Sequence, residues 1–142
     1  MTTIACDGTC IAGDGLITSN GAIHERNCQK VFRLKDGSVV GMTGSVFTFG
    51  DAIAFLDGDK DALAAGDGFE ALILKPTGDV LCMDGKGRTY PQPAPCATGS
   101  GAPFALAAMK CGQSARQAVE VAAHFCTITG GTITVIYPGD AI

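Results

Sequence analysis

The sequence predicts an α+β fold in which antiparallel strands dominate. Short β-rich runs are separated by turn signals, and Asp36-Gly37 between residues 30–34 and 39–43 is a strong hairpin signal. The apolar spacing changes to a helical period after Gly44 and again in the C-terminal third. Two antiparallel sheets packed face to face, with helices on their outer faces, would cover the apolar surfaces. The residues alone support the α+β, antiparallel class and leave this layered arrangement open; we expect a single domain, residues 1–142.

The first third of the chain is predicted to form an antiparallel sheet. Residues 2–7 alternate like a strand, and a tight turn at Gly8 leads to a second strand at residues 10–12. This strand ends at Gly13-Asp14-Gly15, where a glycine on each side of the aspartate lets other backbone approach closely. Only a turn, at residues 19–21, is expected before the next hairpin.

The middle of the chain combines one helix, a loop and a hairpin. Apolar residues recur at helical spacing over residues 45–56, which predicts a short amphipathic helix. Residues 57–68 are polar and rich in glycine, so we expect a loop with at most one helical turn. Residues 69–74 and 79–83 are predicted to form a hairpin, followed by an irregular segment at residues 85–95.

The C-terminal third is predicted to contain two packed helices between two strands. A short strand at residues 96–98 leads into an Ala-rich helix at residues 103–110, which has proline in its first turn. The next helix, residues 114–125, begins with Ser and Gln three positions apart, the pattern of a capping box. Small residues on both helices indicate close packing, and residues 132–136 form the last strand.

Composition excludes several classes of function. The net charge is −4 and no run of Lys or Arg occurs, so no nucleic-acid-binding surface is expected. No apolar run is long enough to span a membrane. The first residues lack the basic and apolar segments of a signal peptide, so we expect a cytoplasmic protein. With 46% hydrophobic and 17% charged residues, part of the apolar surface is expected to be covered by partners.

The seven cysteines are expected to be reduced thiols that pack as small hydrophobic residues. Cys6 and Cys10, together with His24 or Cys28, could supply four ligands to a structural zinc ion. The spacing of these residues is not distinctive for such a site.

Thr2 is the first candidate for chemistry. Removal of Met1 is usual before a small residue, and it would place a hydroxyl and a free α-amine on the same residue. An amine that acts as base on its own hydroxyl is a known way to activate a threonine. The unperturbed pKa of an α-amine, about 7.7–8.0, suits a general base near neutral pH. Because many proteins begin with Met-Thr, this feature gains meaning only if the chain builds a site around Thr2.

Short motifs follow one another in a specific order: Thr2-Thr3-Ile4, Ile11-Ala12-Gly13-Asp14-Gly15, Lys30-Val31 with Arg33-Leu34, Gly41-Met42-Thr43-Gly44, and Gly99-Ser100-Gly101-Ala102-Pro103. Together they resemble the bacterial HslV peptidases and, more distantly, the proteasome β-subunits, which are N-terminal nucleophile hydrolases. The resemblance spans nearly the whole chain and begins directly after Met1. It implies a four-layer α-β-β-α sandwich of two antiparallel sheets.

The resemblance implies catalytic roles for particular positions. Thr2 matches the nucleophile, and Lys30 matches a lysine whose buried ammonium group lowers the pKa of the α-amine. Asp14 matches the carboxylate that orients this lysine. Gly44 matches the residue whose backbone N–H stabilises the oxyanion, and Ser100 matches a serine that helps to move the proton of the amine. Taken alone, Asp14 and Lys30 would indicate only a structural ion pair.

The resemblance also implies binding residues. Met42 and Val46 fall where the family lines its main specificity pocket, which implies a preference for medium-sized apolar side chains. Backbone carbonyls at Ala123, Cys126 and Thr129 match a loop that binds a monovalent or divalent cation. No cofactor is required for the reaction.

The activity implied by the resemblance is that of a threonine-type endopeptidase acting on unfolded polypeptides. Such a peptidase works inside a ring-type homo-oligomer with an ATPase unfoldase as partner. Residues 57–68 replace a long helix that in the family helps to form the ring surfaces and the ATPase docking face. The sequence therefore leaves open whether this chain forms a ring and whether it binds an ATPase. Two alternatives also stay open: a small-molecule amidase with the same chemistry, and a non-catalytic assembly protein that retains Met1.

Overall fold

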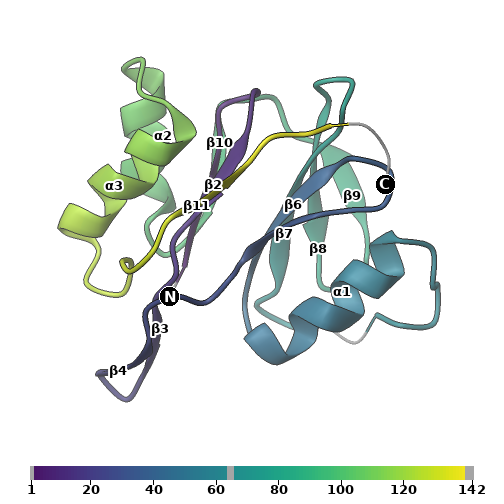
Figure 1. Cartoon of the computed structure of the whole chain (residues 1–142), viewed down its shortest axis with the longest axis horizontal. Coiled ribbons are helices and arrows are strands. Elements are labelled where there is room, and N and C mark those ends of the chain that lie inside the picture. Colours follow the sequence, from purple (N-terminus) through teal and green to yellow (C-terminus); the bar gives the residue numbers. More distant parts are fainter. Residues whose placement is uncertain (1, 64–65, 140–142) are drawn as a thin grey trace.

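The computed structural model describes residues 2–63 and 66–139, which form two antiparallel sheets, a separate hairpin and three α-helices (Figure 1). The first sheet has the strand order β10-β1-β2-β11 and the second has the order β5-β6-β7-β8-β9. The first sheet consists of β1 (Thr3–Cys6), β2 (Ile11–Gly13), β10 (Cys96–Gly99) and β11 (Thr134–Ile136). The second consists of β5 (Val31–Arg33), β6 (Val39–Thr43), β7 (Glu70–Leu74), β8 (Val80–Asp84) and β9 (Thr89–Pro91).

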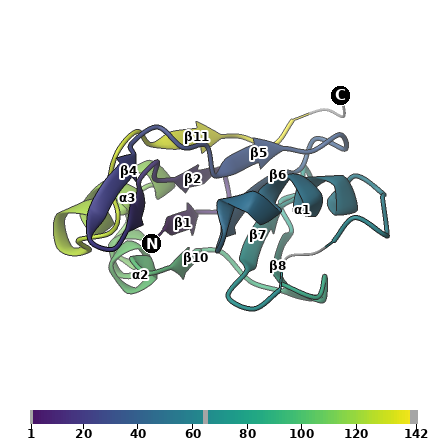
Figure 2. The ribbon, with the colours of Figure 1, turned by 90° about the horizontal axis from the view of Figure 1, so that it is seen from below.

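The helices cover the outer faces of the two sheets (Figures 1 and 2). Helices α2 (Ala102–Lys110) and α3 (Ala115–Phe125) pack on the first sheet through a cluster of small residues, including Ala5, Ala105 and Ala118. Helix α1 (Phe49–Leu56), which follows a 3₁₀ turn at Val46–Thr48, packs on the second sheet. A third buried cluster, including Ile4, Ile11 and Leu72, fills the space between the sheets. The layer order is therefore helix, sheet, sheet, helix.

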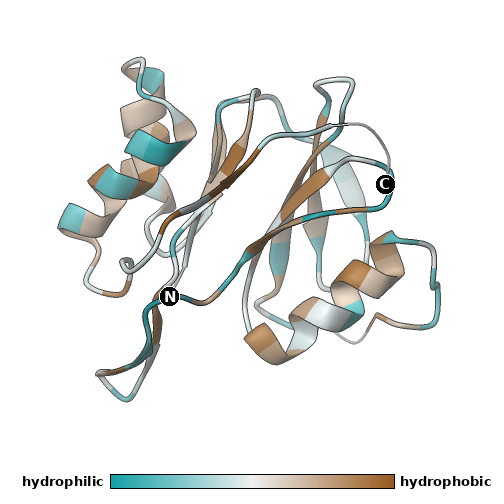
Figure 3. Cartoon of the chain, viewed as in Figure 1, coloured by the Kyte–Doolittle hydropathy of each residue, from teal (hydrophilic) through white to brown (hydrophobic). Residues whose placement is uncertain are grey.

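The pattern of hydrophobic residues explains this arrangement. Figure 3 shows hydrophobic segments on the strands of both sheets and on α1, whereas many of the connecting turns are hydrophilic. Every residue of β1 and of β6 is buried, because each of these strands has packed layers on both faces. The Ser114 hydroxyl accepts a hydrogen bond from the Gln117 N–H and the Gln117 side chain accepts one from the Ser114 N–H, which forms the predicted capping box of α3. Among the described residues, no helix has the length and apolar character needed to cross a bilayer.

The structure confirms the prediction of an α+β fold with antiparallel sheets, and it differs in three places. The two N-terminal hairpins lie in different sheets, because β1 and β2 pair with β10 and β11 while β5 and β6 pair with β7. The irregular segment contains the short strand β9. A further hairpin, β3 (Ile17–Ser19) and β4 (Ala22–Glu25), surrounds the predicted turn.

The β3–β4 hairpin had a recognisable signal. Its turn is Asn20-Gly21, and both residues have positive φ angles, 52° and 77°. Asn-Gly is the preferred pair for such a two-residue turn. The flanking strands escaped prediction because all of β4 is exposed and therefore lacks the alternation of a half-buried strand.

The connection between α1 and β7 contains no helix or strand in its described residues, 57–63 and 66–69. This agrees with the predicted loop. The Asp57 carboxylate accepts a hydrogen bond of 3.0 Å from the backbone N–H of Lys35, which fixes the beginning of the loop against the turn between β5 and β6.

The two sheets approach closely at Gly41 of β6. A β-carbon at this position would lie 2.5 Å from a methyl carbon of Ile4 and 3.0 Å from one of Ile11. Glycine therefore lets β6 pack directly against β1 and β2, which hold Thr2 and Asp14 at their ends.

We predict that Gly41→Ala lowers the free energy of unfolding by about 1–3 kcal/mol, because the added methyl group overpacks the space between the sheets. Gly50→Ala is the matched control, since Gly50 lies in α1 and a β-carbon there would meet no atom within 4 Å. The control is expected to raise stability by about 0.4–1 kcal/mol. Urea denaturation measures both changes, and equal effects of the two substitutions would contradict the close approach of the sheets.

Candidate active site

The strand register brings three of the predicted catalytic residues to the same end of the first sheet. Strand β1 pairs with β2 so that Ile4 lies opposite Gly13, and with β10 so that Thr3 lies opposite Gly99. Thr2, Asp14 and Ser100 each stand just beyond these paired positions. They therefore meet at one edge, although they are far apart in the sequence.

Lys30 reaches this edge from the second sheet. It directly precedes β5, and its ammonium group donates hydrogen bonds to the Asp14 carboxylate at 3.0 Å, the Leu16 carbonyl at 2.7 Å and the Thr2 hydroxyl at 3.2 Å. The side chains of Lys30 and Asp14 are 1% and 0% exposed. The lysine is thus paired with a carboxylate, directed at the threonine hydroxyl and shielded from water.

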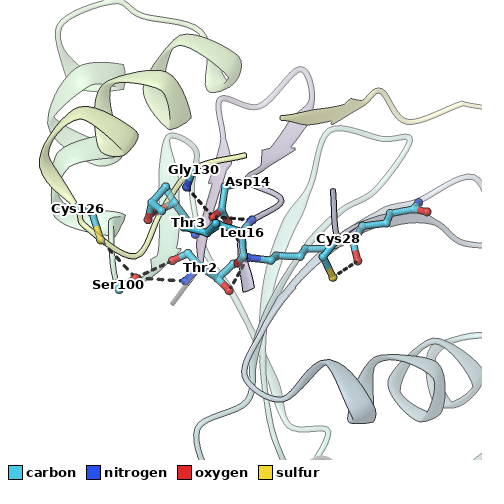
Figure 4. A network of polar contacts seen from close by, with 11 residues as sticks. Thr2, Thr3, Asp14, Leu16, Cys28, Ser100, Cys126 and Gly130 are labelled. Atoms are coloured by element: carbon cyan, nitrogen blue, oxygen red, sulfur yellow. Dashed lines mark hydrogen bonds and ion pairs between the residues drawn. The ribbon is translucent and has the colours of Figure 1, made fainter. Parts of the chain in front are cut away.

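The Asp14 carboxylate is held by the backbone around it (Figure 4). Its Oδ1 accepts from the Thr3 N–H at 3.1 Å as well as from Lys30. Its Oδ2 accepts from the Gly130 N–H at 3.1 Å and from the Leu16 N–H at 3.4 Å. Hydrogen bonds of this kind compensate a carboxylate for its burial. Asp14 thus positions Lys30 and ties β1, β2 and the loop after α3 together.

Thr2 is 4% exposed and has polar contacts on both sides. Its hydroxyl contacts Lys30, while its backbone nitrogen donates to the Ser100 hydroxyl at 3.2 Å. The Ser100 hydroxyl also lies 3.3 Å from the Thr2 carbonyl oxygen. Met1, which the sequence predicts to be removed, lies outside the described residues.

Gly99 makes the approach of β10 to Thr2 possible. Its φ angle is +99°, in the region that favours glycine, and a β-carbon on it would overlap the Thr2 carbonyl oxygen. The absence of a side chain at Gly99 therefore lets the Ser100 hydroxyl reach the Thr2 nitrogen.

A cavity of about 410 Å³ opens beside Thr2. Gly44, which has a φ angle of +109°, lies on its wall between β6 and the 3₁₀ turn. Gly44 and Thr2 also line a second, smaller cavity of about 160 Å³, together with Ser100. A larger cavity of about 500 Å³ lies near the β7–β8 turn, and none of the predicted catalytic residues lines it.

The two residues predicted to form the specificity pocket occupy different places. Val46 lines the cavity beside Thr2. Met42 is 0% exposed and belongs to the buried cluster beneath α1, with Phe49 and Ala52, so it is not among the cavity-lining residues. The alternation of side chains along β6 explains this placement, because Met42 points away from the first sheet towards α1.

The residues predicted to bind a cation lie around the C-terminal end of α3. Ala123 is in its last turn, Cys126 follows it, and the Cys126 carbonyl accepts a hydrogen bond of 3.2 Å from the Thr129 N–H. This helix end carries partial negative charge, which suits a cation. The Thr129 hydroxyl is 2.8 Å from the Thr3 hydroxyl, so the loop is also anchored to β1.

Cys126 borders the site through Ser100. Its thiol lies 3.6 Å from the Ser100 hydroxyl. Burial raises the pKa of Cys126, whereas hydrogen bonds with the side chains of Thr129 and Ser100 and with the backbone of Ile128 lower it, and the net pKa lies below the ordinary thiol value. All seven cysteines are free thiols. Among residues 2–63 and 66–139, no group of three or more His, Cys, Asp or Glu side chains could hold a metal ion.

Sequence reasoning missed the backbone groups that complete the site. The Leu16 carbonyl and the Gly130 N–H contact Lys30 and Asp14 directly, but any residue type supplies these groups. The cavity residues of β3 were also missed, because that strand was not predicted. The Thr129 hydroxyl was missed as well, because only the carbonyl of this residue was expected to take part.

We predict that Asp14→Ala lowers the free energy of unfolding by about 3–5 kcal/mol, because it leaves the buried ammonium group of Lys30 without a counter-charge. Lys30→Met should lower the free energy of unfolding by a smaller amount, since the Asp14 carboxylate keeps three backbone N–H donors. Lys75→Met is the control: it breaks an exposed pair with Asp36 and should change stability by less than about 1 kcal/mol. Chemical denaturation of the three variants measures this order, and equal losses for Asp14→Ala and Lys75→Met would contradict it.

Comparison with known proteins shows relatives along most of the chain. The ATP-dependent protease subunits HslV of Pseudothermotoga lettingae and Caldicellulosiruptor saccharolyticus are both 31% identical, over 89% of this chain and 89% of each relative. HslV of Petrotoga mobilis is 28% identical over 89% of this chain and 88% of the relative. No protein-family model matches the chain.

Solved structures share the fold. BPH of Thiobacillus denitrificans superposes with a TM-score of 0.72 at 23% identity, over 97% of this chain and 98% of BPH. HslV of Trypanosoma brucei superposes with a TM-score of 0.69 at 19% identity, over 96% and 98%. BPH has also been solved in complex with epoxomicin.

The alignments indicate that this chain is shorter than its HslV relatives. The alignment with the Pseudothermotoga protein spans 160 positions, whereas 89% of 142 residues is about 126, so about 34 positions are filled only by the relative. A difference of this size fits the short loop after α1. With the HslV relatives spanning nearly its full length and the fold shared with HslV and BPH, the chain belongs to the HslV and proteasome β-like family of N-terminal nucleophile hydrolases.

Proposed function

We propose that this protein is a threonine-type peptidase in which Thr2 becomes the N-terminal nucleophile after removal of Met1. The observation that carries the proposal is the contact of 3.2 Å between the Lys30 ammonium group and the Thr2 hydroxyl, with Lys30 held by Asp14. A buried positive charge at this position lowers the energy of the developing alkoxide. The names of the HslV relatives, ATP-dependent protease subunits, support the same reaction class.

In the proposed reaction, the Thr2 oxygen attacks the carbonyl carbon of a peptide bond. The hydroxyl proton passes to the α-amine of Thr2, with the Ser100 hydroxyl beside the nitrogen to help move it. The backbone N–H of Gly44 donates to the oxyanion, and collapse of the intermediate expels the amine product, which takes up the proton. Water then hydrolyses the ester between Thr2 and the substrate and regenerates the enzyme.

The proposed substrates are unfolded polypeptides, and the proposed location is the cytoplasm. Proteins of the HslV family form rings, and we propose a homo-oligomer of this kind. Residues 57–68 change the surface that the family's longer helix provides, so an ATPase unfoldase would need a different docking face. A cation at the carbonyls of Ala123, Cys126 and Thr129 would serve to stiffen the loop that holds Asp14 and Thr3; no chemical step is assigned to it.

Intact-mass analysis with epoxomicin tests the nucleophile. This peptide epoxyketone reacts with the hydroxyl and the amine of an N-terminal threonine together, so we expect loss of the Met1 mass and gain of a single inhibitor. Thr2→Ala should lose Met1 but form no adduct. Thr2→Ser is the matched control, because it keeps both reacting groups and should form the adduct. Retention of Met1 with no adduct in the unmodified protein would favour a non-catalytic assembly protein.

A small-molecule amidase with the same nucleophile is the second candidate, and the short loop after α1 favours it because less of the chain is available for ring contacts. The mass of the native particle in solution separates the two. A peptidase chamber predicts a homo-oligomer many times the 14.4 kDa of one chain. A monomer that forms the epoxomicin adduct and hydrolyses small amides would support the amidase.

A further inference from the structure

We propose that the cavity beside Thr2 receives a lysine or arginine side chain, recognised by Asp67 and Phe47. The inference rests on the proposed function, because it assigns the residue whose carbonyl Thr2 attacks. It differs from the apolar preference implied by Met42 and Val46. Both proposed recognition residues line the cavity together with Thr2.

Asp67 supplies the negative charge. It is exposed and is the only carboxylate among the described residues that line this cavity. Lys30, the one cationic side chain that the described part of the chain contributes to the lining, is paired with Asp14 and directed at Thr2. No salt bridge links Asp67 to another described residue. The carboxylate therefore leaves a net negative charge at the cavity wall for a cationic substrate group.

Two cationic residues share a different hollow with Asp67. Asp67 also borders a hollow of about 230 Å³ that contains Lys86 and Arg88. Arg88 pairs with Asp84 at 2.7 Å, and neither Lys86 nor Arg88 lines the cavity of Thr2.

Phe47 supplies an aromatic surface. It lies in the 3₁₀ turn after β6, and it is 93% exposed, the most exposed of the large hydrophobic side chains among the described residues. A ring left in water at the wall of a cavity is explained if a ligand covers it. Aromatic faces attract ammonium and guanidinium groups, so Phe47 and Asp67 favour the same kind of ligand.

The remaining wall suits the rest of a basic side chain. Leu16, Ile17 and Val46 are apolar, and the volume of about 410 Å³ is large enough for an extended side chain. Lysine and arginine bury their methylene groups against apolar surface while the charged end finds a polar partner. The methylene groups would contact these residues and the charge would lie between Asp67 and Phe47.

The test compares two fluorogenic peptides that differ only in arginine or leucine at the residue before the cleaved bond. The ratio of kcat/KM for arginine over leucine is expected to fall by about 5- to 10-fold in Asp67→Asn and in Phe47→Leu, because each removes one attraction for the cation. Asp61→Asn is the matched control, since Asp61 is an exposed carboxylate of the same loop that does not line the cavity. Its ratio should equal that of the unmodified protein.

A binding measurement separates this inference from the proposed function. Thr2→Ala cannot cleave, so fluorescence anisotropy with the same two labelled peptides reports recognition alone. Tighter binding of the arginine peptide, reduced by adding Asp67→Asn, supports the cationic preference even if the protein hydrolyses nothing and forms no epoxomicin adduct. Equal binding of both peptides, or a cleavage ratio that Asp67→Asn and Phe47→Leu leave unchanged, would overturn it.

Discussion

The buried ion pair between Lys30 and Asp14 is the interaction on which the rest of the structure depends. Lys30 leads into the second sheet and Asp14 follows a strand of the first, so the pair joins the two sheets at the edge where Thr2 lies. Removing two charges from water is costly, and here the cost is met by amide donors from Thr3, Leu16 and Gly130 and by the Leu16 carbonyl. The Lys30 ammonium group also donates to the Thr2 hydroxyl, a contact that an ion pair with a purely structural role would not need.

The packing of the sheets gives this pair its geometry. Gly41 lets the sheets approach, and Gly99 lets β10 come close to the residue before β1. Each of these glycines is surrounded by groups that a β-carbon would strike. The small residues of α2 and α3 hold the first sheet from outside, and the loop after α3 returns to contact Asp14 through Gly130 and Thr3 through Thr129. The site is thus supported by three layers of the fold.

The connection between α1 and β7 borders the cavity beside Thr2. Its last residues, Asp67 and Gly68, line the cavity beside Thr2, so a change in length alters the substrate side of the site as well as the outer surface. Of the proposed catalytic residues, Lys30, Asp14 and Ser100 adjoin strands β5, β2 and β10, whereas a β-carbon on Gly44 would lie 3.1 Å from the Gly68 carbonyl oxygen at the end of this loop. The loop therefore borders both the cavity and the residue proposed to stabilise the oxyanion.

The sequence by itself determined the fold class, the order of most strands and helices, the capping box of α3 and the candidate residues Thr2, Asp14, Lys30, Gly44 and Ser100. Local signals were sufficient for the fold class, the elements and the cap, because turn residues and apolar period act over short distances. The roles of Asp14, Lys30, Gly44 and Ser100 followed from the resemblance to HslV. Tertiary structure alone decided which sheet each hairpin joined, that Met42 packs under α1 while Val46 lines the cavity, and that Phe47 and Asp67 stand beside Thr2. These features depend on contacts between residues far apart in the chain. Leu16 and Gly130 complete the site through backbone groups, which every residue type has, so the sequence does not reveal them.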